Sequence, residues 1–214
     1  MKRYDLVTEA DARSIEIGSS IALNPGGQIT PLARDTLRAR RITVESQTDL
    51  DVGGLAPAAD IRRVAIGSDH TGVALKATLR DVLRARGIAV DDVGTESPDP
   101  VDYPDIAARV AWLVARGEVD AGIVIDGAGL GSTIAANKID GVRAAMCTDR
   151  TLARYAREHN GANVLALGAT LVTPEAARAI VDTWLATPMR EARYLRRLAK
   201  IRNLERTRSH PPLA

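Results

Sequence analysis

The chain of 214 residues has a single cysteine, Cys147, and no phenylalanine, with only two tryptophans and four tyrosines. One cysteine excludes an internal disulfide and a zinc site built from several thiolates. Three histidines are too few for a histidine-rich centre, so we expect no metal. The shortage of aromatic residues argues against a base-stacking platform for nucleic acid. It leaves Ala, Val, Ile and Leu to build the core, as in layered α/β domains.

Long hydrophobic runs are missing as well. No apolar segment approaches the roughly 20 residues that a membrane helix needs, and residues 1–5 lack the apolar stretch of a secretory signal. A content of 45% hydrophobic and 26% charged residues is typical of a globular chain. We therefore expect a cytoplasmic protein that does not contact a membrane.

The net charge of +2 is small but unevenly spread. Residues 189–214 carry eight Arg and Lys against two Glu, a local charge of +6. Such a segment can hold phosphate groups, bind nucleic acid or form a solvated helix face. Arg193 and Arg197 are four residues apart on the expected last helix, so their guanidinium groups share one face and could grip a phosphate together.

From residue 64 onward, short apolar runs alternate with amphipathic segments of helical length. Strands are predicted at 64–68, 88–93, 123–125, 143–147 and 163–167, and helices at 73–86, 104–116, 130–138, 149–159 and 174–185. Strands that are each followed by a helix pair in parallel through right-handed crossovers. The sequence therefore predicts a three-layer α/β/α sandwich around a five-stranded parallel, Rossmann-like sheet. In such sheets function gathers at the carboxyl ends of the strands.

The first sixty residues do not follow this alternation. A small N-terminal extension, 1–46, is predicted to contain a helix that starts near Thr8, a strand at 20–23, a turn at 24–27 and a helix at 31–40. Residues 47–61 mix Asp, Gly, Pro and Ala without a period and are predicted to be a linker. The α/β domain, with the basic C-terminal helix, is predicted to span 62–214.

A glycine-rich loop follows the third predicted strand and consists of Gly127, Ala128, Gly129, Leu130, Gly131 and Ser132. Its backbone N–H groups and the helix N-terminus behind it could bind a phosphate or stabilise an oxyanion. A tight turn that merely needs glycine is the alternative. The spacing matches neither the dinucleotide fingerprint nor a P-loop.

Ionisable residues stand near other element ends. Asp69 and His70 end the first predicted strand, and Asp126 ends the third. His159 and Asn160 follow a predicted helix and precede the fifth strand, a position that could swing back over an active site. A histidine at a helix end can also act only as a C-terminal cap.

Several motifs together resemble a known family, the type B ribose-5-phosphate isomerases and their galactose-6-phosphate isomerase relatives. The resemblance runs in order from about residue 64 to residue 204. It implies a metal-free and cofactor-free aldose–ketose isomerase that converts ribose 5-phosphate, or a close analogue, through a cis-enediolate. It also implies a homodimer or homotetramer whose active sites form across the subunit interface. The motifs are Gly67-Ser68-Asp69-His70-Thr71-Gly72, Asp102-Tyr103-Pro104, Gly129-Leu130-Gly131, Arg157-Glu158-His159-Asn160 and Ile180-Val181-Asp182-Thr183-Trp184-Leu185.

The resemblance implies roles for single residues. His70, Arg193 and Arg197 would hold the phosphate, and His159 would help to open the sugar ring. Asp69, Tyr103 and Asn160 would line the substrate, with Asp69 among the catalytic groups. The loop residues that would steady the enediolate are Gly127, Ala128, Gly129, Gly131 and Ser132.

The sequence departs from the family at the catalytic base. Relatives usually have a cysteine where this chain has Asp126, and a carboxylate, with an ordinary pKa of about 3.9, is a weak base unless burial raises that value. Some relatives use a glutamate at the position of Ser132, and many have an arginine at the position of Thr170. Asp126 is nevertheless interpreted as the base. The alternative is a non-catalytic or heteromeric partner subunit that binds sugar phosphates. Cys147 ends the fourth strand and is interpreted as a small buried hydrophobe.

The N-terminal extension resembles short modules on enzymes associated with bacterial microcompartments. The resemblance rests on Leu23-Asn24-Pro25-Gly26 and Ile29-Thr30-Pro31-Leu32-Ala33-Arg34-Asp35. It implies contacts with shell proteins and a location inside a microcompartment. The alternative is an extension that packs on the α/β domain.

Overall fold

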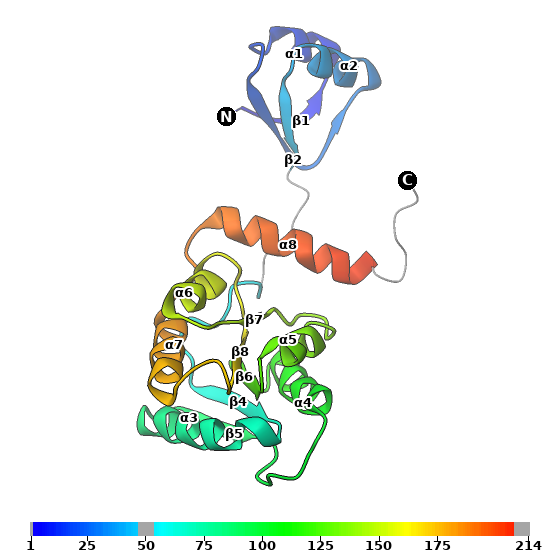
Figure 1. Cartoon of the computed structure of the whole chain (residues 1–214). Coiled ribbons are helices and arrows are strands. Elements are labelled where there is room, and N and C mark those ends of the chain that lie inside the picture. Colours follow the sequence, from blue (N-terminus) through cyan, green and yellow to red (C-terminus); the bar gives the residue numbers. More distant parts are fainter. Residues whose placement is uncertain (1, 47–53, 208–214) are drawn as a thin grey trace. The chain divides into compact units, whose positions relative to one another are not determined.

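A computed structural model describes residues 2–46 and 54–207 of the chain (Figure 1). The chain divides into two units, Met1–Asp51 and Val52–Ala214. Within the described ranges, no helix is long and apolar enough to cross a membrane.

The segment predicted to be a linker, residues 47–61, lies partly outside the described residues, and so does the tail from residue 208. The described part of that segment belongs to the second unit. Leu55 is 3% exposed, and its carbonyl oxygen accepts a hydrogen bond from Arg143 at 3.0 Å. The carbonyl oxygen of Ala58 accepts one from Arg157 at 2.8 Å. These residues therefore pack as part of the larger unit.

The second unit is built on a five-stranded parallel sheet with the order β5-β4-β6-β8-β7. This confirms the predicted fold class. All five predicted strands are present, although the second and the fourth are shorter than expected. The strands are β4 (Arg63–Ser68), β5 (Ala89–Asp92), β6 (Ala121–Asp126), β7 (Ala144–Met146) and β8 (Val164–Gly168).

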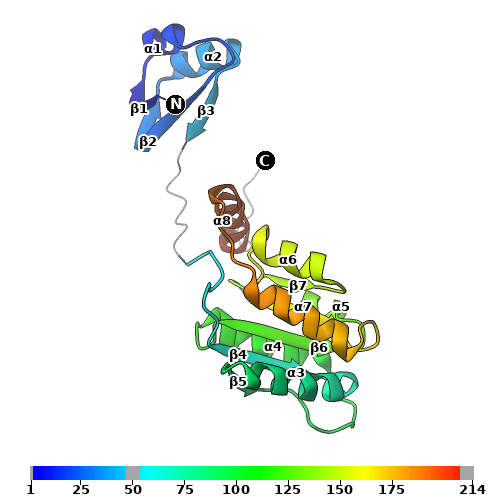
Figure 2. The ribbon, with the colours of Figure 1, turned by 90° about the vertical axis from the view of Figure 1, so that its left-hand side faces the viewer.

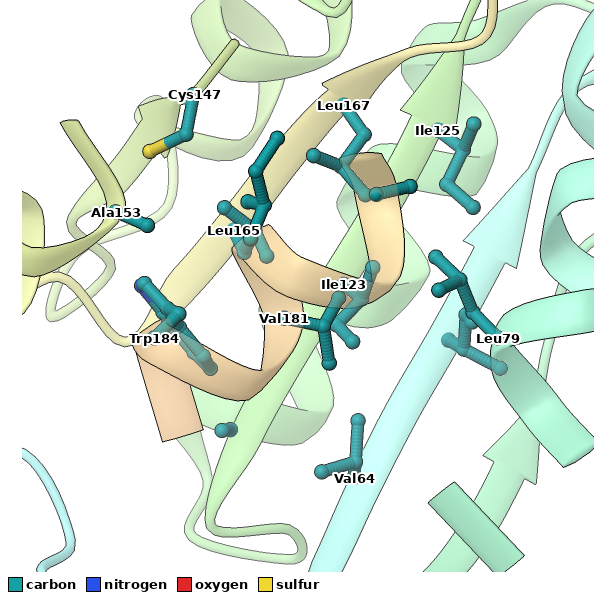
Figure 3. Packing of buried hydrophobic residues seen from close by; sticks show 14 of the residues in the cluster. Val64, Leu79, Ile123, Ile125, Cys147, Ala153, Leu165, Leu167, Val181 and Trp184 are labelled. Atoms are coloured by element: carbon teal, nitrogen blue, oxygen red, sulfur yellow. The ribbon is translucent and has the colours of Figure 1, made fainter. Parts of the chain in front are cut away.

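Helices cover both faces of this sheet (Figures 1 and 2). One face packs against α3 (Val73–Ala85), α6 (Arg150–Glu158) and α7 (Pro174–Ala186), and Figure 3 shows side chains of this layer. The other face packs against α4 (Tyr103–Ala115) and α5 (Leu130–Ala136). Because both faces are covered, the central strands β6 and β8 are buried throughout, as their continuous apolar sequences require.

The helix ends follow local sequence signals. Asp149 caps α6 by accepting hydrogen bonds from the N–H groups of Thr151 and Leu152. Thr173 caps α7, and Pro174 occupies its first turn. A 3-10 turn, η1 (His70–Gly72), precedes α3. The basic helix α8 (Ala192–Thr207) is the last element in the described part of the unit.

The first unit is a β-α-β-α-β module with the elements β1 (Arg3–Val7), α1 (Glu9–Ser14), β2 (Ser20–Ile29), α2 (Pro31–Ala39) and β3 (Thr43–Ser46). Its three strands are parallel in the order β1-β2-β3. Thr8 caps α1 through a capping box with Asp11, as the sequence predicts. The short strands β1 and β3 were not predicted.

The turn predicted at residues 24–27 is wrong, because β2 runs through it. Tyr4 pairs with Leu23, but Leu6 pairs with Gln28, so β2 carries extra residues opposite β1 and bulges. The side chain of Asn24 holds this bulge by donating to Asp5 at 2.8 Å. Gly27 is needed there because a Cβ atom would lie 2.9 Å from the carbonyl oxygen of Tyr4. The turn-forming residues thus produce a bulge within a strand.

Candidate active site

Two buried carboxylates lie at the carboxyl ends of neighbouring strands. Asp69 follows β4 and is 6% exposed, and Asp126 ends β6 and is 4% exposed. The N–H of Asp69 donates to the carbonyl oxygen of Ile125 at 3.1 Å, which ties the two strand ends together. The strand order therefore brings both acids to one edge of the sheet, where parallel α/β folds place their sites.

Asp69 and His70 are fixed by the turn that follows β4. The Oδ1 atom of Asp69 accepts hydrogen bonds from the N–H and the hydroxyl of Thr71, at 2.9 and 2.5 Å. The Nδ1 atom of His70 accepts a hydrogen bond from the N–H of Val101 at 3.3 Å. A neutral imidazole that accepts at Nδ1 carries its proton on Nε2, which is left to donate to a ligand.

Asp126 is held by the glycine loop that follows it. Its Oδ1 accepts from the N–H groups of Ala128, at 2.9 Å, and Gly129, and its Oδ2 accepts from the N–H of Ser132 at 2.8 Å. Three loop donors expected to face a substrate oxyanion therefore face Asp126. The sequence analysis missed this arrangement, because Asp126 lies three residues before Gly129, the N-cap of α5, and so outside the usual capping position.

The rest of the loop packs against neighbours at the same edge. Gly129 has a φ of +77°, which favours glycine. A Cβ atom on Gly131 would lie 2.4 Å from the ring of Tyr103, so glycine admits this ring at the start of α4. Thr170, after β8, donates its hydroxyl to the carbonyl oxygen of Gly127 at 2.7 Å. Asp69, His70, Tyr103, Asp126 and the glycine loop thus form one cluster, called here the rim group.

The remaining predicted site residues lie at the opposite edge of the sheet. Helix α6 leaves the carboxyl end of β7 and runs back, so that His159 and Asn160 precede the amino end of β8. Helix α8 packs there, since a Cβ atom on Gly161 would lie 2.6 Å from Leu198. Figures 1 and 2 place α8 and the end of α6 away from the β8–α7 loop. His159, Asn160, Arg193 and Arg197 are called here the helix group.

This placement corrects the expectation that His159 could swing over the carboxyl edge of its own sheet. A helix that connects two parallel strands spans the sheet from carboxyl to amino ends, so its last residues lie far from the rim. The predicted element order already contained this information.

Aromatic stacking organises the helix group. The ring of His159 stacks on Tyr155, with centroids 4.6 Å apart and planes at 16°, and lies against Tyr194 of α8 at 4.8 Å. The guanidinium groups of Arg193 and Arg197 lie over the Tyr194 ring at 4.8 and 5.6 Å. The sequence analysis named neither tyrosine. The spacing of four between Tyr155 and His159 could have suggested their contact, whereas nothing local links Tyr194 to His159.

A pocket of about 350 Å³ adjoins the helix group, between β7 and α8. Asn160 and Arg143 contribute polar groups to its wall, and Ile201 and Leu204 contribute apolar ones. Burial lowers the pKa of Arg143 from its usual value. The side chain of Asn160 donates to the carbonyl oxygen of Tyr155 at 3.0 Å, which orients it beside His159.

Cys147 has the environment of an inert thiol. It is 1% exposed among apolar side chains, as the sequence predicts, and Figure 3 shows it facing the layer that contains Ala153. Burial, with a smaller contribution from Asp149, raises its pKa to about 12. Cys147 is therefore a neutral thiol near pH 7. Within residues 2–46 and 54–207, no three His, Cys, Asp or Glu side chains are grouped as metal ligands would be.

Comparison with known proteins covers the second unit. The sequence profile of the Ribose/Galactose Isomerase family matches residues 64–201. The chain is 43% identical to ribose-5-phosphate isomerase B of Escherichia coli K12 over 149 residues, which are 70% of this chain and 100% of that protein. It is 40% identical to D-erythrulose-4-phosphate isomerase of Pectobacterium atrosepticum over 124 residues, covering 57% of this chain and 81% of that one.

Solved structures of ribose-5-phosphate isomerase B also match the second unit. Ribose-5-phosphate isomerase B of Clostridium thermocellum superimposes with a TM-score of 0.67 at 49% identity, covering 68% of this chain and 99% of that chain. The family match begins at residue 64, so the first unit lies outside it.

Proposed function

The chain belongs to the ribose/galactose isomerase family, and on that premise we propose that it interconverts ribose 5-phosphate, or a close analogue, and the ketose phosphate through a cis-enediolate. Family membership makes the chain a sugar-phosphate isomerase. The sugar, the intermediate and the roles of single residues are the proposal. D-erythrulose-4-phosphate isomerase among the relatives makes a four-carbon sugar the first analogue to test.

The rim group is the observation that carries the proposal. Isomerisation needs a base that removes the proton from C2 and returns it to C1. Asp126 and Asp69 are two buried carboxylates joined at neighbouring strand ends, beside a histidine that can donate to an anion. Hydrogen bonds from Thr71 to Asp69 and from the glycine loop to Asp126 offset the cost of burying these carboxylates.

In the proposed mechanism, Oδ2 of Asp126 takes the C2 proton of the open-chain aldose. The electrons of the C–H bond form a C1–C2 double bond, and the carbonyl oxygen becomes the enediolate oxygen. The C2 hydroxyl passes its proton across the cis-enediolate to the oxygen on C1, and Asp126 returns the carbon-bound proton to C1. The C1–C2 double bond is thereby lost, the oxygen on C1 ends as a hydroxyl, and the oxygen on C2 becomes the new carbonyl. Oδ2 accepts one N–H, from Ser132, and so keeps a lone pair for this transfer.

The other residues hold the substrate. His159 assists ring opening, His70, Arg193 and Arg197 bind the phosphate, and Asp69, Tyr103 and Asn160 line the sugar. Because Ala128, Gly129 and Ser132 already donate to Asp126, the glycine loop acts chiefly by orienting the base. The N–H of Gly131, in the first turn of α5, remains for the oxyanion.

The direct test is proton exchange on the substrate. The purified protein is incubated with ribose 5-phosphate in D2O, and NMR follows loss of the C2 hydrogen and formation of ketose. We expect both, and we expect Asp126→Asn to slow exchange by about 10²- to 10⁴-fold. An Asp126→Asn variant with full exchange would remove Asp126 from the role of base and leave Asp69 as the carboxylate to examine.

We also infer that one site needs two copies of the chain. The rim group and the helix group lie at opposite edges of one sheet, yet both are assigned to one substrate. A second copy would bring its helix group to the rim group of the first. Leu130 and Ile134 on α5, 59% and 62% exposed beside the glycine loop, offer apolar surface for such contact.

One observation favours a second candidate function, a sugar-phosphate-binding subunit that works with a cysteine-bearing partner. The loop donors of Ala128, Gly129 and Ser132 are occupied by Asp126 rather than free for substrate. Turnover by the purified protein alone, on a panel of four- to six-carbon sugar phosphates, would dispose of this candidate. Turnover only after a cysteine-bearing relative is added would support it.

For the first unit we propose a docking role towards microcompartment shell proteins. Its support is the separate fold of residues 2–46, with its own core and outside the family match. Deletion of residues 1–46 is expected to abolish co-assembly with shell proteins. Unchanged co-assembly would end the idea and favour a purely structural extension.

A further inference from the structure

We propose that Tyr194 is a positioning residue that holds His159 and the arginines Arg193 and Arg197 as one unit. This inference rests on the proposed function, which assigns ring opening to His159 and phosphate binding to the arginines. Tyr194 contacts all three: the imidazole at 4.8 Å between centroids, and the two guanidinium carbons at 4.8 and 5.6 Å from its ring centroid.

The burial of these side chains fits a positioning role. Tyr194 is 6% exposed, whereas Arg193 and Arg197 are exposed on the same helix. The hydroxyl of Tyr194 also accepts a hydrogen bond from Nη2 of Arg193 at 3.0 Å. A buried ring with a bonded hydroxyl has little freedom, so it can set the orientation of groups packed against it.

Stacking leaves the arginines able to bind an anion. A guanidinium group has five N–H donors, and its contact with an aromatic ring does not consume them. Arg193 uses one donor on the Tyr194 hydroxyl and keeps others. Arg193 also pairs with Glu191 at 2.6 Å, and a phosphate must compete with that carboxylate. Arg197 makes no ion pair with any residue in the described ranges, so its donors are the more available ones.

A consequence for specificity follows. The phosphate and the ring carbon C1 of a sugar phosphate are separated by a distance that depends on the number of carbons between them. Because the Tyr194 ring contacts both His159 and the two arginines, it fixes the span between the two points of recognition. Tyr194 therefore contributes to selection among four-, five- and six-carbon substrates.

The test compares Tyr194→Phe, which keeps the ring, with Tyr194→Leu, which removes it. Leu198→Ala, a buried change on the same helix, controls for loss of packing. We expect Tyr194→Phe to lose about 2- to 10-fold in kcat/KM through a higher KM, since only the hydroxyl contact to Arg193 is gone. We expect Tyr194→Leu to lose about 100-fold, with lower kcat and weaker discrimination among substrates of different length.

A double-mutant cycle separates positioning from folding. His159→Gln and Arg197→Ala are combined in the wild-type and in the Tyr194→Leu background, and binding of ribose 5-phosphate is measured by calorimetry beside turnover. We expect the two changes to be non-additive in the wild type and additive without the Tyr194 ring. Two results would overturn the role of Tyr194: an equal coupling free energy between the two substitutions in both backgrounds, or a loss of kcat/KM in Tyr194→Leu no greater than in Leu198→Ala.

If the protein binds ribose 5-phosphate but does not turn it over, the proposed function is refuted. The role of Tyr194 is then still tested by the same cycle, measured on binding.

Discussion

At the scale of single residues, Asp126 holds the glycine loop in place and is also the proposed base. Its oxygens accept three N–H groups of the glycine loop. The sequence resemblance implies that most members of the family have a cysteine at this position. The loop conformation and the proposed base are therefore coupled in this chain. A cysteine at this position could not bond all three N–H groups.

We predict that Asp126→Cys retains isomerase activity but with a changed pH dependence. A free thiol has an ordinary pKa of about 8.5, so the rate should rise at higher pH than in the wild type as the thiolate forms. The variant should also be less stable, by about 1–3 kcal/mol, because charged hydrogen bonds to the loop are lost. pH–rate profiles and chemical unfolding measure both effects. Identical profiles for the two proteins would contradict the assignment of the base.

Cys147 gives a prediction about stability at alkaline pH. Its pKa is raised from 9.0 to about 12 by burial, so above pH 9 the unfolded thiol ionises while the folded thiol does not. The stability that the buried neutral thiol contributes is complete below pH 9 and is lost as the pH rises towards 12. Between pH 8 and pH 10 the wild type should lose about 1.4 kcal/mol of unfolding free energy relative to Cys147→Ala. Turnover at pH 7.5 should be the same in both proteins, and parallel stability curves would show that the thiol is not buried.

At the scale of elements, the glycine loop depends on its contact with α4. We predict that Gly131→Ala destabilises the protein by about 1–3 kcal/mol and lowers kcat/KM, because its Cβ would overlap the ring of Tyr103. Gly127→Ala is the matched control for stability, since its Cβ would meet only the hydroxyl of Thr71 at 3.7 Å. Thermal unfolding should separate the two variants clearly. Equal stabilities would mean that Tyr103 moves freely away from the loop.

The elements of the second unit could be predicted because the pattern of apolar residues along the chain is clear in each of them. Buried parallel strands such as 123–125 are continuously apolar, and the capping signals at Asp149 and Thr173 act within a few residues. The strands of the first unit were harder to predict from the sequence. Asn24, Pro25, Gly26 and Gly27 favour a turn in isolation, but the residues on either side of them, Leu23 and Gln28, both pair with β1, so the four residues form a bulge within β2.

Part of the candidate site could be predicted because the strands that position it could be predicted. Residues that directly follow strands, such as Asp69 and Asp126, could be placed at the rim from element order alone. The hydrogen bonds around Asp126 and the contact of Tyr194 with His159 depend on backbone direction and on packing between distant segments. No sequence pattern encodes such contacts.

At the scale of the whole molecule, two largely buried arginines, Arg143 and Arg157, bind the 55–58 segment to the rest of the second unit. Arg157 is 1% exposed, and burial, together with Arg143, lowers its pKa to about 10. Both side chains donate to the 55–58 segment, at the carbonyls of Leu55 and Ala58. Each arginine also donates within its own part of the fold, Arg143 to the carbonyl oxygen of Gly161 at 2.8 Å and Arg157 to that of Ala162 at 3.0 Å. The 55–58 segment thus supplies one of the acceptors of each guanidinium.

We predict that a chain starting at residue 54 is as stable and as active as the full chain, since residues 1–51 form a separate unit. A chain starting at residue 61 should be less stable by about 2 kcal/mol or more, because hydrogen bonds to two buried charges are removed. Thermal unfolding and kcat/KM of the two truncated proteins measure the difference. Equal behaviour would show that water replaces both carbonyls at no cost.

The assembly of one active site from two copies is tested most directly by mixing inactive variants. Asp126→Asn damages the rim group, and Arg197→Ala damages the helix group. If each site takes one group from each copy, the mixed dimer contains one site with both groups intact. After unfolding and refolding together, an equal mixture should regain about a quarter of the wild-type activity on ribose 5-phosphate, while each variant alone stays nearly inactive. Activity in the mixture no higher than the mean of the two separate variants would contradict the account.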